Sequence, residues 1–276
     1  MTHQGGTPMR TCVALLVAIG VACAAAAAQE KPFEPQVGQA GKDVVWVPTP
    51  VETVEKMLDL AAVTPQDFVV DLGSGDGRNV IAAAKRGARG LGVEYNPDMV
   101  ALSKRSAASA GVSDKAQFVQ GDMYEADFSK ANVLALFLLP SNLLKLRPKF
   151  LELQPGSRIV SNTFFIEEWP PDQTVQVEGD CTSWCTAILY IVPAKVEGTW
   201  RTAQGTLSLT QMYQMLNGTL STGGQSSEVV GRLKGDQITL KAGTWEFNGQ
   251  VKGNRIEGSG RTAGGAPAAW SATRSN

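Results

Sequence analysis

The sequence predicts an α/β fold, a doubly wound seven-stranded sheet, followed by a small all-β barrel or sandwich domain. A buried apolar strand at Phe68–Leu72 runs into a glycine-rich turn and then an amphipathic helix. Apolar strand-like runs and helical segments alternate from there to about residue 193. From Val196 onward, short strand-like pieces rich in Gly, Thr, Ser and Gln recur every few residues. A chain of 276 residues is long enough for two such domains.

Residues 1–28 have the composition of a secretory signal peptide. Arg10 precedes the apolar run Cys12–Cys23, and an alanine tract leads to Gln29. The run is short and rich in alanine beside the ~20 strongly apolar residues that a membrane span prefers. We therefore expect cleavage near Ala28 and export to the periplasm or beyond, with no permanent membrane span. A lipoprotein or N-terminally anchored form is the alternative, because Gly20–Cys23 resembles a lipoprotein processing site.

Charge and cysteine content limit the chemistry. Lys+Arg total 25 and Asp+Glu total 26, so no basic footprint predicts a nucleic-acid partner. The one histidine, His3, lies in the signal segment, and two thiols without a histidine do not complete a zinc site, so no metal is expected. Cys181 and Cys185 would lie roughly 13 Å apart on a straight strand, whereas a turn between them would allow a disulfide. Bridged cysteines and free thiols both remain open.

The segment before the sheet divides into two parts. Residues 29–44 are polar and contain prolines and glycines, which predicts a linker or a loosely held arm. Pro48 and Pro50 then fix an extended stretch. We expect Thr49 to cap a helix at Val51–Leu60, with Pro50 at its first position.

The glycine turn is the first candidate binding site. Asp71 precedes Gly73, Gly75 and Gly77, a G-x-G-x-G spacing. The dinucleotide fingerprint would need a glycine where Arg78 stands, which argues against a nicotinamide-linked oxidoreductase. A strand, a glycine turn and a helix N-terminus let a ligand approach the backbone closely and predict unpaired amide N–H groups facing it. Three alternating glycines are costly to order, which argues against a turn that binds nothing.

Two more acidic residues follow the next strands. Glu94 ends the second strand, where it is placed to accept hydrogen bonds from a ribose diol. Asp122 and Met123 follow a third strand at Ala116–Gln120, although on their own they indicate only a turn. Ligands of open α/β sheets bind beyond the carboxyl ends of the strands. Asp71, Glu94 and Asp122 are therefore expected at one edge of the sheet.

The remaining elements complete a Rossmann-like order. In sequence they are a helix from Asn96 to Ala110, a buried strand within Ala131–Leu139, Pro140–Asn142 before a helix through Leu153, a strand at Arg158–Asn162, and an antiparallel hairpin of Thr174–Val177 with Ala187–Val192.

The region from Val196 predicts a small antiparallel β domain. Gly198–Trp200 opens it and Trp270–Arg274 closes it, as if the end strands paired. The tryptophans Trp200, Trp245 and Trp270 either stack on a sugar or pack in the core, and core packing is favoured. The region shows no catalytic constellation, so binding or surface display is expected of it.

These motifs together resemble a known family. Asp71 with G-x-G-x-G resembles the first motif of class I S-adenosylmethionine-dependent methyltransferases. Val47–Pro50, Asp71–Arg78, Leu138–Pro140 and Leu146–Lys149 resemble more narrowly the protein-lysine methyltransferases related to the mitochondrial enzyme that methylates a lysine of ATP synthase. The likeness covers residues 45–195 and implies S-adenosylmethionine as cofactor and a protein lysine amine as acceptor.

The resemblance also implies roles for single residues. Asp122 would bond the adenine amino group and Met123 would pack on the ring. Pro140 and Asn142 would orient the amine in a channel lined by the Leu138–Asn142 loop. Phe137 and Ser161–Thr163 stand where relatives tend to carry tyrosine and histidine, which leaves the acceptor open. The expected cofactor-binding residues are Thr49, Asp71, Gly73, Ser74, Gly75, Gly77, Glu94, Asp122 and Met123.

A non-catalytic nucleoside-binding module of the cell envelope, with an adhesive β domain, is the alternative function. Export would separate the chain from a cofactor made in the cytosol, which favours this alternative or methylation before or without export. The missing histidine does not exclude catalysis, because alignment of an activated donor alone supplies roughly 7–11 kcal/mol of a barrier.

Overall fold

The computed structural model describes residues 1–6, 33–179, 181–262 and 264–275. Residues 1–32 and Phe33–Asn276 form two units. Most of the expected signal peptide, residues 7–28, lies outside the described residues. Among the helices that the structure describes, none combines the length and the apolar character needed to cross a membrane.

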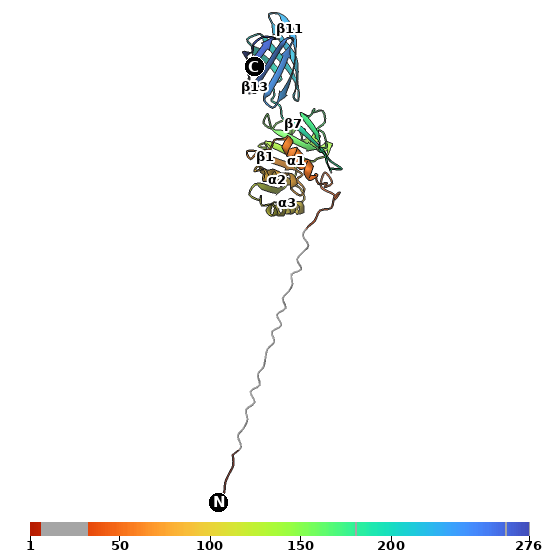
Figure 1. Cartoon of the computed structure of the whole chain (residues 1–276), viewed down its shortest axis with the longest axis vertical. Coiled ribbons are helices and arrows are strands. Elements are labelled where there is room, and N and C mark those ends of the chain that lie inside the picture. Colours follow the sequence, from red (N-terminus) through yellow and green to blue (C-terminus); the bar gives the residue numbers. More distant parts are fainter. Residues whose placement is uncertain (7–32, 180, 263, 276) are drawn as a thin grey trace. The chain divides into compact units, whose positions relative to one another are not determined.

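The first part of the larger unit is a seven-stranded sheet in the order β3-β2-β1-β4-β5-β7-β6 (Figure 1). Strands β1 to β5 pair in parallel, and β7 runs antiparallel to both β5 and β6. The elements are α1 (Val51–Leu60), β1 (Phe68–Leu72), α2 (Arg78–Lys85), β2 (Arg89–Glu94), α3 (Pro97–Ser109), β3 (Ala116–Gln120), β4 (Val133–Leu136), α4 (Pro140–Phe150), β5 (Arg158–Asn162), β6 (Gln173–Gln176) and β7 (Thr186–Ile191). The predicted doubly wound sheet is confirmed.

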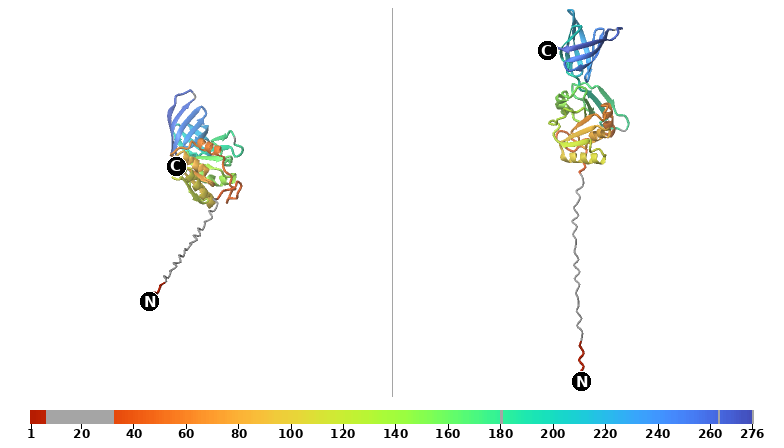
Figure 2. Two further views of the ribbon diagram at one scale, coloured as in Figure 1. Left: turned by 60° about the horizontal axis from the view of Figure 1, so that its bottom comes forward. Right: turned by 90° about the vertical axis from the view of Figure 1, so that its left-hand side faces the viewer.

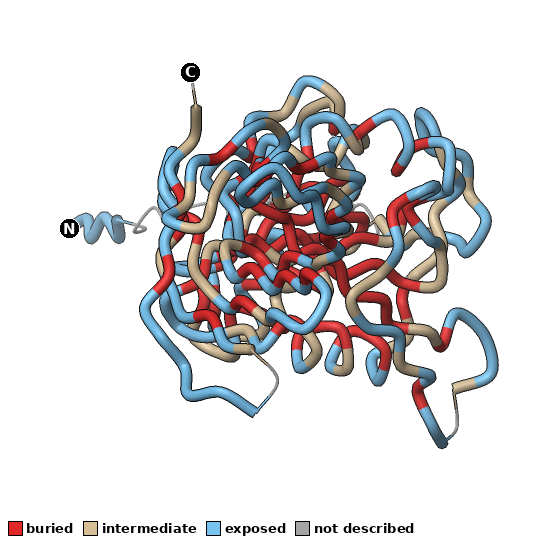
Figure 3. The backbone as a smooth tube through the Cα atoms, turned by 90° about the horizontal axis from the view of Figure 1, so that it is seen from above, coloured by how far each residue is buried: buried red, intermediate tan, exposed pale blue. Residues whose placement is uncertain are grey.

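Helices bury both faces of this sheet, because successive side chains of a strand point to opposite sides. Val69 packs in a cluster with residues of α1 and α2, such as Met57 and Ala83. The next residue, Val70, packs in another cluster with Phe150 and its neighbours on α4. Figure 3 marks the buried residues of the chain in red. The glycine loop after β1 is therefore held between two packed layers.

Two helix starts differ from expectation. Pro50 is the N-cap of α1 rather than its first residue, and no side chain caps this helix, so the cap predicted for Thr49 is wrong. The backbone carbonyl of Thr49 instead accepts a 2.6 Å hydrogen bond from Nη1 of Arg78. Helix α4 begins at Pro140, so Pro140–Asn142 form its first turn and not a preceding loop. Proline favours a first helical position because its φ is already helical and it has no N–H to satisfy.

The second part is a closed eight-stranded antiparallel barrel, drawn in blue in Figure 2. The end strands pair as predicted, with Arg274 opposite Trp200. Trp200 and Trp270 are buried in its core, whereas Trp245 is partly exposed. The strands are β8 (Gly198–Thr202), β9 (Thr206–Met212), β10 (Met215–Thr222), β11 (Gln225–Lys234), β12 (Gln237–Ala242), β13 (Trp245–Lys252), β14 (Arg255–Thr262) and β15 (Ala268–Arg274). Closure into a barrel decides between the two predicted β architectures.

Cys181 and Cys185 are bridged by a disulfide. Their Cα atoms are 5.9 Å apart, far less than an extended strand would allow, because the chain turns between them before β7 begins. Trp184 within this turn has a positive φ of 60°. The structure therefore selects the bridged state of the two that the sequence left open.

Candidate active site

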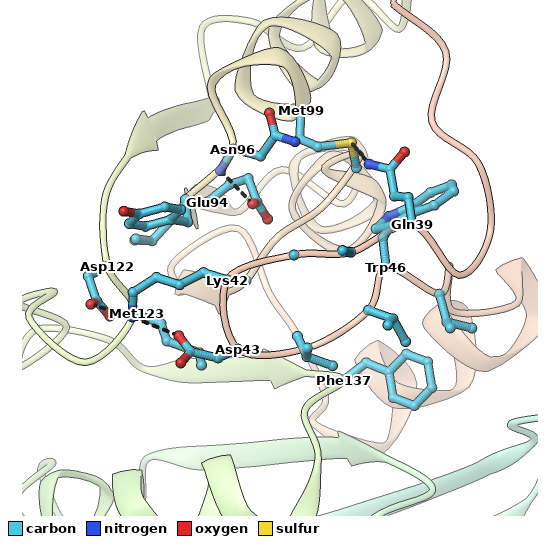
Figure 4. A pocket seen from close by; sticks show the side chains of 18 of the residues that line it. Gln39, Lys42, Asp43, Trp46, Glu94, Asn96, Met99, Asp122, Met123 and Phe137 are labelled. Carbon is cyan, nitrogen blue, oxygen red and sulfur yellow. Dashed lines mark hydrogen bonds and ion pairs between the residues drawn. The ribbon is translucent and has the colours of Figure 1, made fainter.

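A cavity of about 90 Å³ opens beyond the carboxyl ends of β1, β2 and β3 (Figure 4). A smaller cavity of about 30 Å³ lies against the glycine loop, and Gly73, Trp46 and Phe137 border both. The first is lined by Gly73, Glu94, Asp122 and Met123, and the second by Thr49, Asp71, Gly73, Ser74 and Gly75. Among the expected cofactor residues only Gly77 lines neither cavity. It is the N-cap of α2.

The glycine loop requires glycine for both conformation and space. Gly73, Gly75 and Gly77 have φ values of 75°, 56° and 84°, a region that side chains disfavour. A Cβ on Gly75 would lie 2.7 Å from Nε1 of Trp46, and one on Gly77 would lie 2.6 Å from the ring of Phe118. The G-x-G-x-G spacing therefore places glycine where the backbone has a positive φ and, at Gly75 and Gly77, where neighbouring side chains leave no room for a Cβ.

The expectation of unpaired amides in this loop is wrong for four residues. The N–H groups of Gly73 and Ser74 both donate to the carbonyl of Val93, at 2.8 and 3.0 Å. Gly75 N–H donates to Oε2 of Glu94 at 2.9 Å, and Gly77 N–H donates to the Ser74 carbonyl. These bonds tie the loop to the end of β2. The glycines thus allow close approach to a ligand more than they supply hydrogen-bond donors.

Glu94 is fixed at the edge of the larger cavity. Its Oε1 accepts the Asn96 N–H and its Oε2 accepts the Gly75 N–H, both at 2.9 Å. A carboxylate oxygen accepts more than one hydrogen bond, so Glu94 retains capacity for two neighbouring hydroxyl groups. This geometry suits the ribose diol that the sequence predicted.

Asp71 is buried beneath the smaller cavity, with 3% of its surface exposed. Burial raises its pKa well above the usual range, the negative charges of Glu94 and Asp76 raise it further, and a 3.0 Å hydrogen bond from Asn79 Nδ2 opposes them. Oδ1 of Asn79 and Oγ of Ser74, both buried, have no hydrogen-bond partner among the described residues. Unsatisfied buried polar atoms beside a cavity indicate a polar ligand, which fits the charged end of an adenosyl amino acid.

Asp122 forms an ion pair with a residue of the N-terminal arm, here defined as Phe33–Val47. Nζ of Lys42 lies 3.0 Å from its Oδ2, and Tyr124 N–H donates to its Oδ1 at 2.9 Å. The Tyr124 bond and Lys42 lower the pKa of Asp122. The resemblance implies that Asp122 binds the adenine amino group of the cofactor. In this structure the ammonium group of Lys42 bonds the same carboxylate.

The N-terminal arm contributes a wall of the cavity that sequence reasoning missed. Gly38 N–H donates to the Trp46 carbonyl and Trp46 N–H to the Gln39 carbonyl, each at 2.9 Å. These bonds fold the arm back on itself, and the ion pair of Lys42 with Asp122 ties it to the site, where Figure 4 shows Lys42 and Trp46 beside the cavity. A tryptophan within a polar, proline-containing stretch was the available signal, because an indole there needs a packing partner.

Pro140 and Asn142 line neither cavity. Asn142 is buried, its Oδ1 accepts from Ser141 Oγ at 3.1 Å, and its Nδ2 has no partner among the described residues. Their role in orienting an amine stays a prediction. Phe137, just before them, is the residue of this stretch that borders both cavities.

The fold and the site together define a class I S-adenosylmethionine-dependent methyltransferase. A mostly parallel sheet with an antiparallel β7, a glycine loop after β1 and carboxylates after β2 and β3 is the arrangement that binds this cofactor. Residues 71–173 match the family model of the ANTKMT methyltransferase domain.

Known proteins agree with this class. A protein-lysine N-methyltransferase of Saccharolobus islandicus is 40% identical over 152 residues, which cover 54% of this chain and 94% of that protein. A mouse lysine N-methyltransferase named for an ATP synthase subunit is 40% identical over 117 residues, 42% of this chain and 47% of the mouse protein. A Salinibacter ruber protein described as an RNA methyltransferase, solved with S-adenosyl-L-homocysteine, is 47% identical over 54% of this chain and 96% of its own, with a TM-score of 0.51.

The chain belongs to the methyltransferase family of the Saccharolobus protein. S-adenosylmethionine is its cofactor. The chain spans only about half the length of the mouse relative, and the family-model match at residues 71–173 ends before the β-barrel begins.

Proposed function

We propose that this protein transfers a methyl group from S-adenosylmethionine to the side-chain amine of a protein lysine. The observation that carries the proposal is the pair of neighbouring cavities at the glycine loop, which share lining residues and are polar at Glu94 and Asp71 and apolar at Phe137. The name of the Saccharolobus relative, which is matched almost over its full length, supports the lysine acceptor.

The chain's own residues would hold and shield the reactants. S-adenosylmethionine, when bound, supplies a sulfonium-activated methyl group, which the acceptor nitrogen takes with its lone pair as the carbon–sulfur bond breaks and leaves a thioether. Glu94 and Asp122 hold the nucleoside through hydrogen bonds, and Met123 packs against it. An apolar surface such as Phe137 excludes water from the amine and favours its neutral, nucleophilic form. The methylated ammonium then loses one proton to solvent.

RNA is the competing acceptor, because the Salinibacter relative is described as an RNA methyltransferase. The near balance of 25 basic and 26 acidic residues favours a protein, since nucleic-acid binding rests on an excess of positive charge. A non-catalytic nucleoside-binding role finds no support among the relatives, which are named as methyltransferases.

The decisive experiment is transfer of a radiolabelled methyl group to a cell-envelope extract. We expect label in protein that is removed by protease, resists RNase, and is recovered as methyllysine after acid hydrolysis. Glu94→Gln serves as the matched variant with weakened cofactor binding and should lower the label at sub-saturating cofactor. Label found in RNA would show that RNA, not a protein lysine, is the acceptor. Binding of S-adenosyl-L-homocysteine without any methyl transfer would favour the non-catalytic module.

We also propose that the chain is exported and that residues 1–28 are removed, leaving the methyltransferase domain at 45–195 and the β domain at 196–276. The Cys181–Cys185 disulfide supports export, because disulfides persist mainly in oxidising compartments. N-terminal sequencing of the protein from a periplasmic fraction tests this. A start near Gln29 is expected, and an intact Met1 in the cytosol would contradict it.

A further inference from the structure

Three aromatic side chains form a continuous surface beside the cofactor cavity. The ring centroids of Phe137 and Phe164 are 6.0 Å apart, those of Phe137 and Trp184 are 5.5 Å apart, and those of Phe164 and Trp184 are 5.6 Å apart. We call these three residues the aromatic wall. Phe137 joins the wall to the site, because it lines both cavities, and Figure 4 shows its ring among the side chains around the larger one.

The wall is not simply part of the hydrophobic core. Trp184 is 39% exposed, and Phe137 and Phe164 are only half-buried. The wall therefore exposes aromatic surface to solvent, next to the one wall residue, Phe137, that lines the cofactor cavities. An apolar surface that stays exposed beside a catalytic cavity is a feature typical of a binding site.

The backbone is held so that Trp184 joins this wall. Its φ of 60° is unfavourable for a large side chain, so the surrounding structure must impose it. The Cys181–Cys185 disulfide closes the turn around Trp184. Oγ1 of the buried Thr53 on α1 donates to the Trp184 carbonyl at 3.1 Å. A disulfide and a buried hydrogen bond thus fix one exposed tryptophan.

We propose that the aromatic wall binds the acceptor lysine, with its aliphatic stem against Phe164 and its nitrogen between the faces of Phe137 and Trp184, beside the cofactor cavity. The nitrogen is an ammonium when it arrives, before it loses its proton, and again after methylation. This inference rests on the proposed lysine acceptor. Aromatic faces attract alkylammonium groups without needing an N–H donor from them. The wall therefore holds a lysine that has already gained methyl groups, which the hydrogen-bond acceptors of a polar site would release.

The test uses the full-length oxidised protein loaded with S-adenosyl-L-homocysteine. The probe is a glycine-flanked peptide with one trimethyllysine, and its partner is the same peptide with the neutral carbon isostere of that side chain. We expect tighter binding of the trimethyllysine peptide. Trp184→Leu should weaken it by about fivefold, within the range for cation–π contacts, whereas Trp184→Phe should restore most of the affinity. Binding of the isostere should change little.

The matched control is Trp245→Leu, because Trp245 is 38% exposed on β13 of the barrel. We expect it to leave peptide binding unchanged. Replacing both Cys181 and Cys185 by serine should lower the affinity for the trimethyllysine peptide, while the affinity for S-adenosyl-L-homocysteine stays within twofold. The double serine variant tests whether the position of Trp184 matters, because it leaves all three aromatic rings of the wall in place. Circular dichroism checks that this variant and Trp245→Leu are folded.

Equal binding of the charged and neutral peptides, or unchanged binding to Trp184→Leu, would overturn the inference. Neither result would touch the proposed function, which depends on the transfer assay and on binding of S-adenosyl-L-homocysteine. Conversely, label found only in RNA would overturn the lysine acceptor whatever the peptide measurement showed.

Discussion

At the scale of single residues, Asp71 is a buried acid whose charged form its surroundings disfavour. Burial raises its pKa, so folding retains a proton that the unfolded chain releases above about pH 3.9. Stability therefore falls as pH rises from the unfolded pKa towards the raised folded pKa. The site keeps a destabilising acid where the cofactor binds.

We expect Asp71→Asn to increase the free energy of unfolding at pH 7, by about 1 kcal/mol, because no charge is then buried. The Asn79 amide can rotate to offer its unpartnered Oδ1 to the new side chain. The same variant should bind S-adenosyl-L-homocysteine at least tenfold more weakly. Urea unfolding at pH 4 and pH 7 measures the stability, with the gain expected only at the higher pH. A loss of stability at pH 7 would contradict this account.

Asn142 tests a role that the cavities do not show directly. It lines neither cavity and its Nδ2 has no partner among the described residues. If Asn142 and the Pro140 carbonyl orient the amine, Asn142→Ala should lower the turnover number by about tenfold, in the range of a positioning effect, with cofactor affinity nearly intact. Steady-state kinetics and calorimetry separate the two quantities. A tenfold loss of cofactor affinity would refute the role.

At the scale of elements, the glycine loop joins β1 to α2 and is crowded at specific points. A Cβ on Gly75 would meet the Trp46 indole of the N-terminal arm at 2.7 Å. Gly111, which follows α3, has a similar positive φ of 70° but no atom within 4 Å of the same added carbon. Substitutions at these two glycines therefore distinguish the cost of an unfavourable φ, which both share, from the cost of a steric clash, which only Gly75 has.

We expect Gly111→Ala to cost about 1 kcal/mol of stability through its φ alone and to leave cofactor binding unchanged. Gly75→Ala should cost more and should also weaken S-adenosyl-L-homocysteine binding at least tenfold, because it displaces Trp46 from the cavity wall. Thermal unfolding and calorimetry on both variants check this. Equal effects of the two substitutions on binding would show that steric contact with the arm is unimportant.

At the scale of the whole molecule, the barrel depends on pairing between its first and last strands. Arg274 on β15 lies over the Trp200 ring at 4.4 Å, and it also donates to the carbonyls of Glu197 and Lys195. These bonds close the barrel where its ends meet, and closure removes the free edges of the sheet.

Arg274→Ala should therefore reduce the free energy of unfolding by about 1–2 kcal/mol. The side chain of Arg201, exposed on the paired strand β8, has no hydrogen bond or ion pair among the described residues. Arg201→Ala is therefore the control and should change stability by less than about 0.5 kcal/mol. Denaturant unfolding followed by circular dichroism measures the free energy of unfolding of both variants. Similar losses for both variants would mean that the closing contacts contribute little.

The predicted elements agree well where local pattern decides. β3 and β5 have the predicted bounds, and the end strands of the barrel pair as the sequence indicated. The prediction failed at Thr49, whose carbonyl is used by an arginine distant in sequence. It also failed for the loop amides, which pair with β2. Both outcomes depend on partners that no local pattern identifies.

The sequence by itself determined the sheet, the glycine loop and the carboxylates after successive strands, because hydrophobic period and turn chemistry are local properties. Only the tertiary structure decided that the arm of Phe33–Val47 covers the cavity, that Cys181 and Cys185 are bridged, and that Phe137 meets Trp184. Each of these contacts joins segments far apart in the chain or needs a specific turn. Such contacts arise from packing, which sequence spacing does not encode.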